Sequence, residues 1–260
     1  MAFSEDGVTI EVDGAVRIVT ICRGERNAID QELHEALVEV WKRIESDPQA
    51  RAVLLRADGK HFSAGGDFAW FLELNADDGL REQSFVDGQR LLDAMLKFPL
   101  PVVVAVQGAA VGLGASMVML SDYVFMADTA FLRDPHTSIG LTAGDGGLIW
   151  PFSTGMHIAK QYLLLGDKFT ATEAHRLGVA NTLVSGDDLR QRALETAHRF
   201  AALPPQAAQT TKRALNMLIE HNAGAAMAYA LASERLGYHT PEFQAKLAEF
   251  DSGSRAAASG

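Results

Sequence analysis

The chain has 260 residues, which is enough for one large domain with a sizeable core. Its formal net charge of -10 excludes a nucleic-acid-binding surface, since no stretch gathers enough Lys and Arg to neutralise a run of phosphates. With 48% hydrophobic and 22% charged residues the composition is that of a soluble globular protein, and the single Cys22 excludes a disulfide framework.

The apolar patterning predicts no membrane segment. The longest apolar runs, such as Val102–Val106, are far too short to cross a bilayer, and residues 1–6 lack the basic-then-apolar order of a signal peptide. A lone cysteine also suits a reducing compartment. We therefore expect a cytoplasmic protein that has neither a membrane nor a nucleic acid as a partner.

The chain opens with a predicted hairpin and helix. Apolar residues alternate over 8–12 and again over 16–21, around Asp13-Gly14, which predicts a hairpin at the edge of a sheet. Apolar residues at intervals of three and four then predict an amphipathic helix over 30–46, with Asp30 as its N-cap.

The middle of the chain predicts buried strands with helices between them. Continuous apolar runs at 52–55 and 102–106 are typical of strands covered on both faces, and a further strand is expected over 123–126. This rhythm places the chain in the α/β class. Residues 128–150 are rich in Gly and Pro, which predicts a loop.

Beyond Pro151 the patterns become helical. Helices are expected over 156–165, 187–202, 205–222 and 226–249, so the last third reads as an all-helical appendage. We divide the chain into a core over 1–200, a C-terminal helical oligomerisation region over 201–251, and a flexible tail over 252–260 that is rich in Ser, Gly and Ala.

Two glycine-bearing turns carry the strongest chemical signal. They are His61–Asp67 and Gln107–Gly114, and the second directly follows the apolar run Val102–Val106. Glycines let a backbone approach a ligand closely, and a turn that opens a helix leaves unpaired N–H groups in front of it. The two turns together predict a two-amide oxyanion hole for a carbonyl oxygen that becomes negative during reaction.

The other glycine-rich segments and the histidines do not have the spacing of known nucleotide-binding, nucleophile or zinc motifs. The third glycine of a dinucleotide-binding fingerprint would fall at Met117, and no Lys-Ser/Thr follows Gly144–Gly147 as a P-loop requires. No nucleophile elbow surrounds Ser63 or Ser116. No two histidines have zinc-site spacing, so we expect no metal.

An ordered set of short stretches resembles the crotonase superfamily, the group of enoyl-CoA hydratases and isomerases. Each stretch is weak alone, but their order and spacing are specific over roughly residues 8–220. The stretches are Glu25–Ile29, Phe62–Asp67, Val104–Gly108 with Gly112–Gly114, Ser121-Asp122, Ile139-Gly140 with Gly146-Gly147, and Thr211–Asn216.

The resemblance implies a crotonase spiral of ββα units with a C-terminal helical trimerisation region, assembled as a homotrimer or hexamer. It also implies an acyl-CoA substrate and no separate cofactor, because coenzyme A enters as part of the substrate. Carried over by position, the amides of Gly66 and Leu113 hold the thioester oxygen. The implied coenzyme A and acyl contacts are Asn27, Ala28, Ala64, Phe68 and Phe71.

The chain departs from the family at the catalytic carboxylates. Hydratases of the family have one at the position of Ser116 and one at the position of His136. A serine is no base near neutral pH, but a neutral imidazole is available there. We expect His136 to act as the general base, with Asp145 bonded to its far nitrogen and Ser116 and Gly144 as candidates for positioning water or substrate. The plain alternative is a loop histidine and a helix N-cap.

The loop of residues 134–151 resembles the oxocamphor hydrolase branch of the superfamily, whose members cleave a carbon–carbon bond of a β-diketone with a His/Asp pair. Three functions therefore stay open. The first is hydration or isomerisation of an enoyl-CoA. The second is hydrolytic ring opening of a β-keto acyl-CoA or β-diketone, and the third is acyl-CoA binding without catalysis. Ala69 stands where the family has a lysine for coenzyme A, and the basic C-terminal ending is missing.

Overall fold

The computed structural model describes residues 3–258, and the side chains of residues 3–252. The main sheet has the strand order β1-β2-β3-β4-β5-β7-β10. The first three strands pair antiparallel and the pairs from β3 to β10 are parallel. These strands are β1 (Phe3–Glu5), β2 (Val8–Asp13), β3 (Val16–Ile21), β4 (Ala52–Ala57), β5 (Val102–Val106), β7 (Tyr123–Ala127) and β10 (Thr182–Val184).

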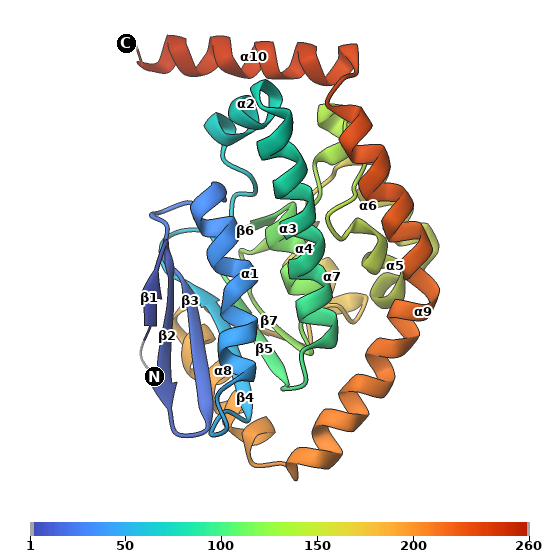
Figure 1. The fold of residues 1–260 in the computed structure, drawn as a ribbon. Coiled ribbons are helices and arrows are strands. Elements are labelled where there is room, and N and C mark those ends of the chain that lie inside the picture. The colour runs from blue at the N-terminus through green and yellow to red at the C-terminus, as the bar shows by residue number, and fades with distance from the viewer. Residues whose placement is uncertain (1–2, 259–260) are drawn as a thin grey trace.

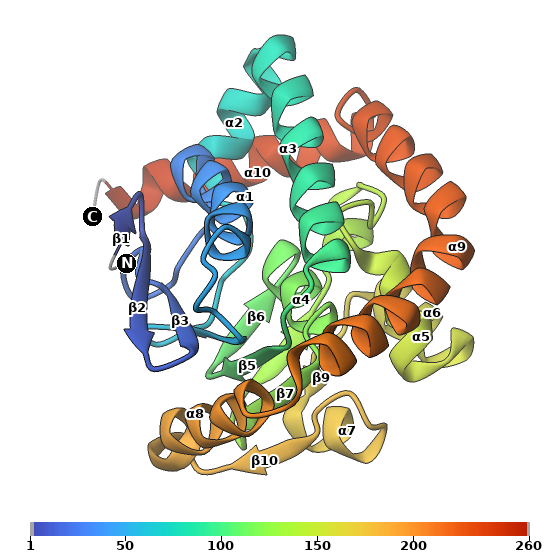
Figure 2. The same ribbon diagram turned by 60° about the horizontal axis from the view of Figure 1, so that its bottom comes forward.

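Every residue of β3, β4 and β5 is buried, as continuous apolar runs predicted for strands with both faces covered. Helices α1 (Gln31–Glu45) and α3 (Asp78–Lys97) pack together over one face, and α8 (Gly186–Ala201) contacts β4, β5 and β7. Figure 2 shows α8 on the side of the sheet away from α1 and α3. The predicted hairpin and α/β class are confirmed, although β1 pairs outside β2 and so forms the edge.

A second, smaller sheet lies beside the first. It has the order β6-β8-β9, from β6 (Ala109–Val111), β8 (Phe131–Arg133) and β9 (Phe169–Thr170). Short helical elements surround it and bound the region of the glycine turns. They are α2 (Phe68–Ala76), α4 (Leu113–Met119), α5 (Trp150–Thr154), α6 (Met156–Leu165), α7 (Ala171–Arg176) and the 3-10 turns η1 (His136–Ile139) and η2 (Gly147–Ile149).

The C-terminal part differs from expectation in three details. It is not all helical, because β9 and β10 follow Pro151. The break expected near residues 222–226 is absent. Instead α9 runs from Pro205 to Gly237, and the break falls before Pro241. Helix α10 (Pro241–Ala258) continues past the start of the predicted flexible tail, and residues 259–260 of that tail lie outside the described residues.

An ion pair between Asp122 and the buried Lys212 ties α9 to the main sheet. Lys212 Nζ donates to Asp122 Oδ2 at 2.6 Å and to the carbonyl of Leu100 at 2.9 Å. Asp122 Oδ2 also accepts the Val102 N–H at 2.7 Å, at the start of β5. From this anchor α9 runs up one side of the molecule to α10, which crosses above α2 (Figure 1).

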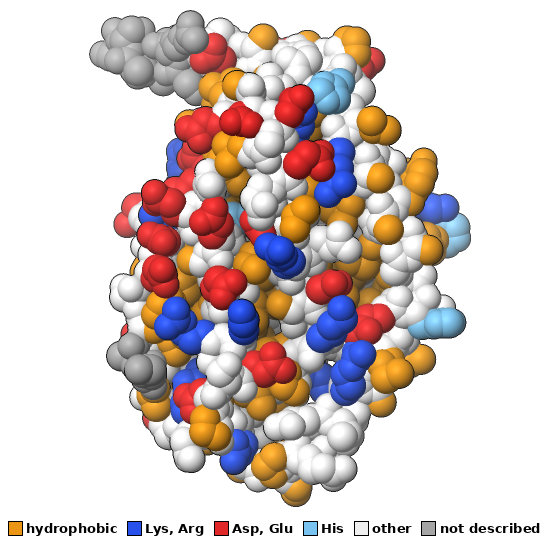
Figure 3. All heavy atoms as spheres, in the orientation of Figure 1, with side chains coloured by type: hydrophobic (Ala, Val, Ile, Leu, Met, Phe, Trp, Pro, Cys, Tyr) orange, Lys and Arg blue, Asp and Glu red, His pale blue; other side chains and the backbone are white. Residues whose placement is uncertain are grey.

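The surface carries charges of both signs. Figure 3 shows acidic and basic side chains interspersed over the face in view, without a continuous basic stripe. None of the helices in the described part of the chain is long and apolar enough to span a bilayer.

Candidate active site

The two glycine turns pack directly against each other. Ser63 N–H donates to the Ala109 carbonyl at 3.0 Å, and Val111 N–H donates to the Ser63 carbonyl at 3.0 Å. A Cβ on Gly114 would lie 2.7 Å from the Ser63 Cβ, closer than real side chains approach. Glycine at 114 is therefore what lets the two turns meet.

The geometry leaves one N–H free on each turn. Ile29 N–H donates to Gly65 O at 2.8 Å and Asp67 N–H donates to Ile29 O at 2.7 Å, so this bridge passes over the N–H of Gly66. Leu113 is the first residue of α4, where an N–H has no acceptor within its helix. Within the described residues, no hydrogen bond uses either N–H.

Gly66 and Leu113 both line a cavity of about 650 Å³. The cavity is bordered by the glycine turns, the segment after β8, and helices α1, α2, α3, α9 and α10. Its walls are largely apolar, and they include Phe68, Trp70, Phe71, Leu74, Phe85, Tyr238, Phe243, Leu247 and Phe250. A pocket of this size and lining suits an apolar group with a few polar contacts.

His136 lies in this cavity wall, held from one side by Asp134. Asp134 Oδ1 accepts the His136 backbone N–H at 3.1 Å and bonds to His136 Nδ1 at 2.7 Å. A Cβ on Gly112 would lie 3.9 Å from His136 Cε1, so the ring adjoins the residue before Leu113. The orienting hydrogen bond expected from Asp145 is thus made by Asp134 instead.

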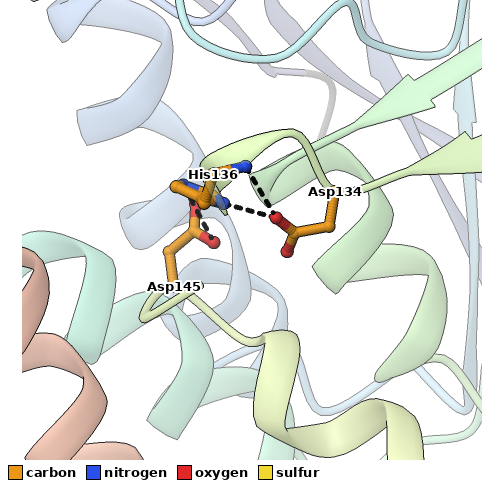
Figure 4. A group of neighbouring side chains, drawn as sticks. All are labelled: Asp134, His136 and Asp145. Atoms are coloured by element: carbon orange, nitrogen blue, oxygen red, sulfur yellow. Dashed lines mark hydrogen bonds and ion pairs between the residues drawn. The ribbon is translucent and has the colours of Figure 1, made fainter. Parts of the chain in front are cut away.

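Two more carboxylates face the other ring nitrogen. Asp145 Oδ1 lies 3.8 Å from His136 Nε2, and Glu234 Oε1, from α9, lies 3.7 Å from it. Figure 4 shows Asp134 and Asp145 approaching His136 from two directions. Asp145 and Glu234 line the cavity together with His136. The site therefore has one imidazole among three carboxylates.

Comparison with known proteins decides the family. The family model described as enoyl-CoA hydratase/isomerase matches residues 11–245. A short-chain-enoyl-CoA hydratase from Clostridium acetobutylicum is 30% identical over 227 residues, which are 86% of this chain and 86% of that relative. The chain belongs to the enoyl-CoA hydratase/isomerase family.

Solved structures agree with this assignment. An enoyl-CoA hydratase/isomerase from Mycobacterium paratuberculosis superposes with a TM-score of 0.90 at 40% identity, covering 94% of this chain and 98% of that chain. A β-diketone hydrolase from the cyanobacterium Anabaena gives a TM-score of 0.83 at 24% identity over 90% of this chain and 94% of that chain, a likeness of fold alone. The crotonase fold and an enzymatic function are confirmed.

The protonation of this family member's site follows from burial and mutual charge. Burial alone would lower the pKa of His136, but the charges of Asp134, Asp145 and Glu234 and the bond to Asp134 together raise it well above its ordinary value. Burial opposes ionisation of Asp134, yet the adjacent imidazolium keeps its pKa below the usual range. The neutral imidazole expected from the ordinary histidine pKa is therefore replaced by an imidazolium.

The two carboxylates on the Nε2 side have raised pKa values. Burial raises the pKa of Glu234 to about 8, and the charges of Asp145 and Asp134 add to the rise against the opposing charge of His136. Burial also raises the pKa of Asp145, and the His136 charge opposes that rise. At neutral pH Glu234 carries a proton. Buried carboxyl groups with raised pKa values beside an imidazolium are candidates for proton transfer.

The candidate water-positioning residues lie behind the cavity wall. Ser116 is fully buried, its Oγ donates to the Gly112 carbonyl at 3.3 Å, and a Cβ on Gly146 would lie 2.6 Å from that Oγ. Gly144 packs against α9, where a Cβ would collide with Glu234 Oε2 and lie 3.0 Å from the Ala230 carbonyl. Gly144 thus leaves the space that the Glu234 carboxyl group occupies, and it does not line the cavity.

The residues implied for coenzyme A and acyl contacts divide into two groups. Ala64, Phe68 and Phe71 line the cavity. Asn27 is fully buried, and its Nδ2 donates to the carbonyls of Asp58 at 2.6 Å and His61 at 2.9 Å, so its side chain braces the first glycine turn. Ala28 does not line the cavity, although the next residue, Ile29, does.

The sequence analysis missed Asp134 and Glu234. Asp134 had a local signal, because an aspartate commonly bonds the backbone N–H two residues later. Glu234 had none, since only the course of α9 brings it to His136. One donor atom each from Asp134, His136 and Asp145 lies within 4.8 Å of the others, which makes this cluster the place where the described chain could hold a cation. The absence of a metal remains a prediction.

Proposed function

We propose that this enzyme adds water across the double bond of an enoyl-CoA. The observation that carries the proposal is the single cavity that Gly66, Leu113, His136, Asp145 and Glu234 all line. The sequence alone indicated no pair of carboxyl groups for hydration, because Ser116 and His136 stand where the family has its two catalytic carboxylates. Asp145 and Glu234 now supply two carboxyl groups from other parts of the chain.

The thioester oxygen would accept hydrogen bonds from the free N–H groups of Gly66 and Leu113. As hydroxide adds to the β-carbon, the double-bond electrons move onto this oxygen and form an enolate. Donors already aimed at the developing charge stabilise that state without reorganisation, and losing one such donor typically costs about a hundredfold to a thousandfold in kcat.

The acid and base steps fit the two carboxyl groups. In this scheme the carboxylate form of Asp145 takes a proton from the attacking water, and Glu234, whose raised pKa favours its protonated form, delivers one to the α-carbon when the enolate collapses. His136 lies between them, 3.8 Å from Asp145 Oδ1 and 3.7 Å from Glu234 Oε1. Its Nε2 can pass a proton to Glu234 and recover one from Asp145, which restores the starting state.

The anionic part of coenzyme A needs local cations, since the chain as a whole is acidic. Arg133 and Lys246 are the Lys and Arg side chains among the described residues that line the cavity. Lys246 Nζ pairs with Glu249 at 2.7 Å and Arg133 Nε donates to the Gly166 carbonyl at 2.7 Å. We assign both to the coenzyme A phosphates, in place of the family lysine that Ala69 replaces.

A panel of acyl-CoA thioesters followed by mass spectrometry tests this function. Straight-chain enoyl, β-keto and cyclic β-keto thioesters are incubated with the enzyme and with the Asp145→Asn and Glu234→Gln variants. Hydration predicts that enoyl substrates gain one water and form a β-hydroxyacyl-CoA, with both variants slowed about a hundredfold or more.

The other outcomes contradict the proposal and name its replacement. A shifted double bond at unchanged mass identifies isomerisation. A new carboxylate from a β-keto substrate identifies hydrolytic carbon–carbon cleavage. Measurable affinity without any product identifies an acyl-CoA binder.

A further inference from the structure

Two polar aromatic side chains line the same cavity without hydrogen-bond partners. His34, on α1, is 4% exposed, and no hydrogen bond within the described residues uses its ring nitrogens. Trp70, on α2, is 8% exposed, and its Nε1–H is buried without a partner. The two rings are neighbours, with centroids 5.3 Å apart. Buried polar groups normally have partners, so this pair calls for an occupant of the cavity.

The backbone leaves room beside this pair. A Cβ on Gly88 of α3 would lie 3.8 Å from His34 Nε2, and Gly88 also lines the cavity. The glycine therefore opens the space in front of the imidazole edge. His34, Trp70 and Gly88 come from three separate helices that meet at this wall.

The chemistry of the pair selects a neutral oxygen. Burial lowers the pKa of His34 to about 4, so the ring is neutral and has one donor and one acceptor nitrogen. The indole offers a donor only. The negative charge of Asp87 already acts on His34, and the cavity-lining cations are Arg133 and Lys246, on other elements. A carboxylate here would be repelled, whereas a carbonyl or hydroxyl oxygen would satisfy the unpaired donors.

We propose that His34 and Trp70 bind an oxygen atom that the acyl group carries away from its thioester, so that the preferred substrates are oxo- or hydroxyacyl-CoA thioesters. This specificity rests on the proposed acyl-CoA function. A hydrocarbon chain would instead cover the His34 ring nitrogens without pairing them, which costs binding free energy.

Binding of unreactive ligands tests the specificity apart from catalysis. Saturated acyl-CoA thioesters of one length are compared by calorimetry, with a ketone moved carbon by carbon along the chain, against the plain chain. Wild-type enzyme is expected to bind one ketone isomer about tenfold or more tightly than the plain chain. Trp70→Phe, which keeps the ring and removes the N–H, should abolish the preference, and His34→Phe should do the same.

Trp41→Phe is the matched control. Trp41 Nε1 is also buried without a partner, but Trp41 packs against Phe98 in the core and does not line the cavity. Its variant should keep the full preference. Equal binding of all thioesters by wild type, or an equal loss in Trp41→Phe, overturns the oxygen site.

The readout separates the two proposals. A ketone preference without turnover of any thioester would contradict the hydratase function and support the oxygen site. Hydration of enoyl-CoA without a ketone preference would support the hydratase function and contradict the oxygen site.

Discussion

Asp134 is the residue on which the charge state of the site depends most directly. Its Oδ1 bonds both the backbone N–H and Nδ1 of His136. In Asp134→Asn the shape is kept and the charge is lost, so the pKa of His136 should fall and the ring should lose its fixed orientation. We expect kcat to fall about a hundredfold or more.

Histidine NMR titration and a pH–rate profile measure both effects of Asp134→Asn. Asp128→Asn, in an exposed turn after β7, is the control and should leave both unchanged. An unshifted His136 pKa in Asp134→Asn would show that Asp134 does not set the charge of the ring.

Glu234 predicts how stability depends on pH. Its pKa rises from 4.5 to about 8 on folding, so between these values the folded state keeps a proton that the unfolded chain has released. The contribution is fully present below 4.5 and is lost as pH rises through about 8, so the free energy of unfolding should decrease across this window. The raised pKa of His136 acts in the same direction, with its contribution lost at higher pH.

Urea unfolding on either side of this pH window gives the measurement. Glu234→Gln should flatten the decrease, because glutamine does not titrate. Glu195→Gln, exposed on α8, should leave it unchanged. A wild-type stability that rises with pH through the window would contradict the raised pKa of Glu234.

How far the sequence could predict the site depends on how local each contact is. Gly66, Leu113 and His136 lie in short segments whose order along the chain is distinctive, and all three line the cavity. The protonation state was not predictable, because the pKa of His136 depends on Glu234, whose approach depends on where a long helix ends. The partner of His136 Nδ1 was missed because the prediction considered only Asp145, although an aspartate two residues before the histidine was a local signal for Asp134.

At the scale of elements, α9 links the glycine-rich loop to the site. A Cβ on Gly144 would collide with Glu234 and lie 3.1 Å from the Leu231 Cα. Gly144→Ala should push the loop away from α9 and misplace Glu234, with a loss of about a hundredfold in kcat. Steady-state kinetics alongside thermal unfolding would detect it.

Gly224→Ala on the same helix is the matched control. Gly224 is exposed and nothing lies within 4 Å of the position of a Cβ there. Because alanine is the better helix former, the variant should be more stable by about 0.5–1 kcal/mol with unchanged kinetics. Equal kinetics in the two variants would mean that the packing of Gly144 against α9 is irrelevant to catalysis.

The elements themselves were predictable where periodicity is strong. The helix expected over 156–165 matches α6 (Met156–Leu165), and the strands at 52, 102 and 123 begin where expected. The short β9 and β10 could not be seen, because two or three residues are too few to show a period. The continuity of α9 was missed because helix packing compensates for Gly224, which sequence alone marks as a weak point.

At the scale of the whole molecule, helices α9 and α6 expose several large apolar side chains to solvent. The exposed side chains include Leu215, Met217, Leu218, Tyr229 and Leu236 on α9 and Met156, Leu164 and Leu165 on α6. Figure 3 shows hydrophobic side chains at the edge where Figure 1 places α9. Contiguous exposed apolar surface marks a site of association.

We therefore expect light scattering to give three or six times the chain mass of 28.0 kDa. Leu165→Glu combined with Leu236→Glu should lower that mass. Val12→Glu, at an exposed apolar residue of β2, should not. A wild-type monomer would contradict the predicted homotrimer or hexamer.

The path of α9 determines whether the N-terminal part of the chain could catalyse the reaction without the C-terminal helices. One end of this helix is fastened to the sheet through Lys212, and the other end brings Glu234 to the imidazole. A chain shortened before residue 205 would keep both glycine turns, His136 and Asp145, yet it would lack Glu234, the group proposed to protonate the α-carbon of the enolate. Under the proposed mechanism, the boundary expected near residue 200 would therefore separate groups that act in one reaction, and neither piece alone would catalyse it.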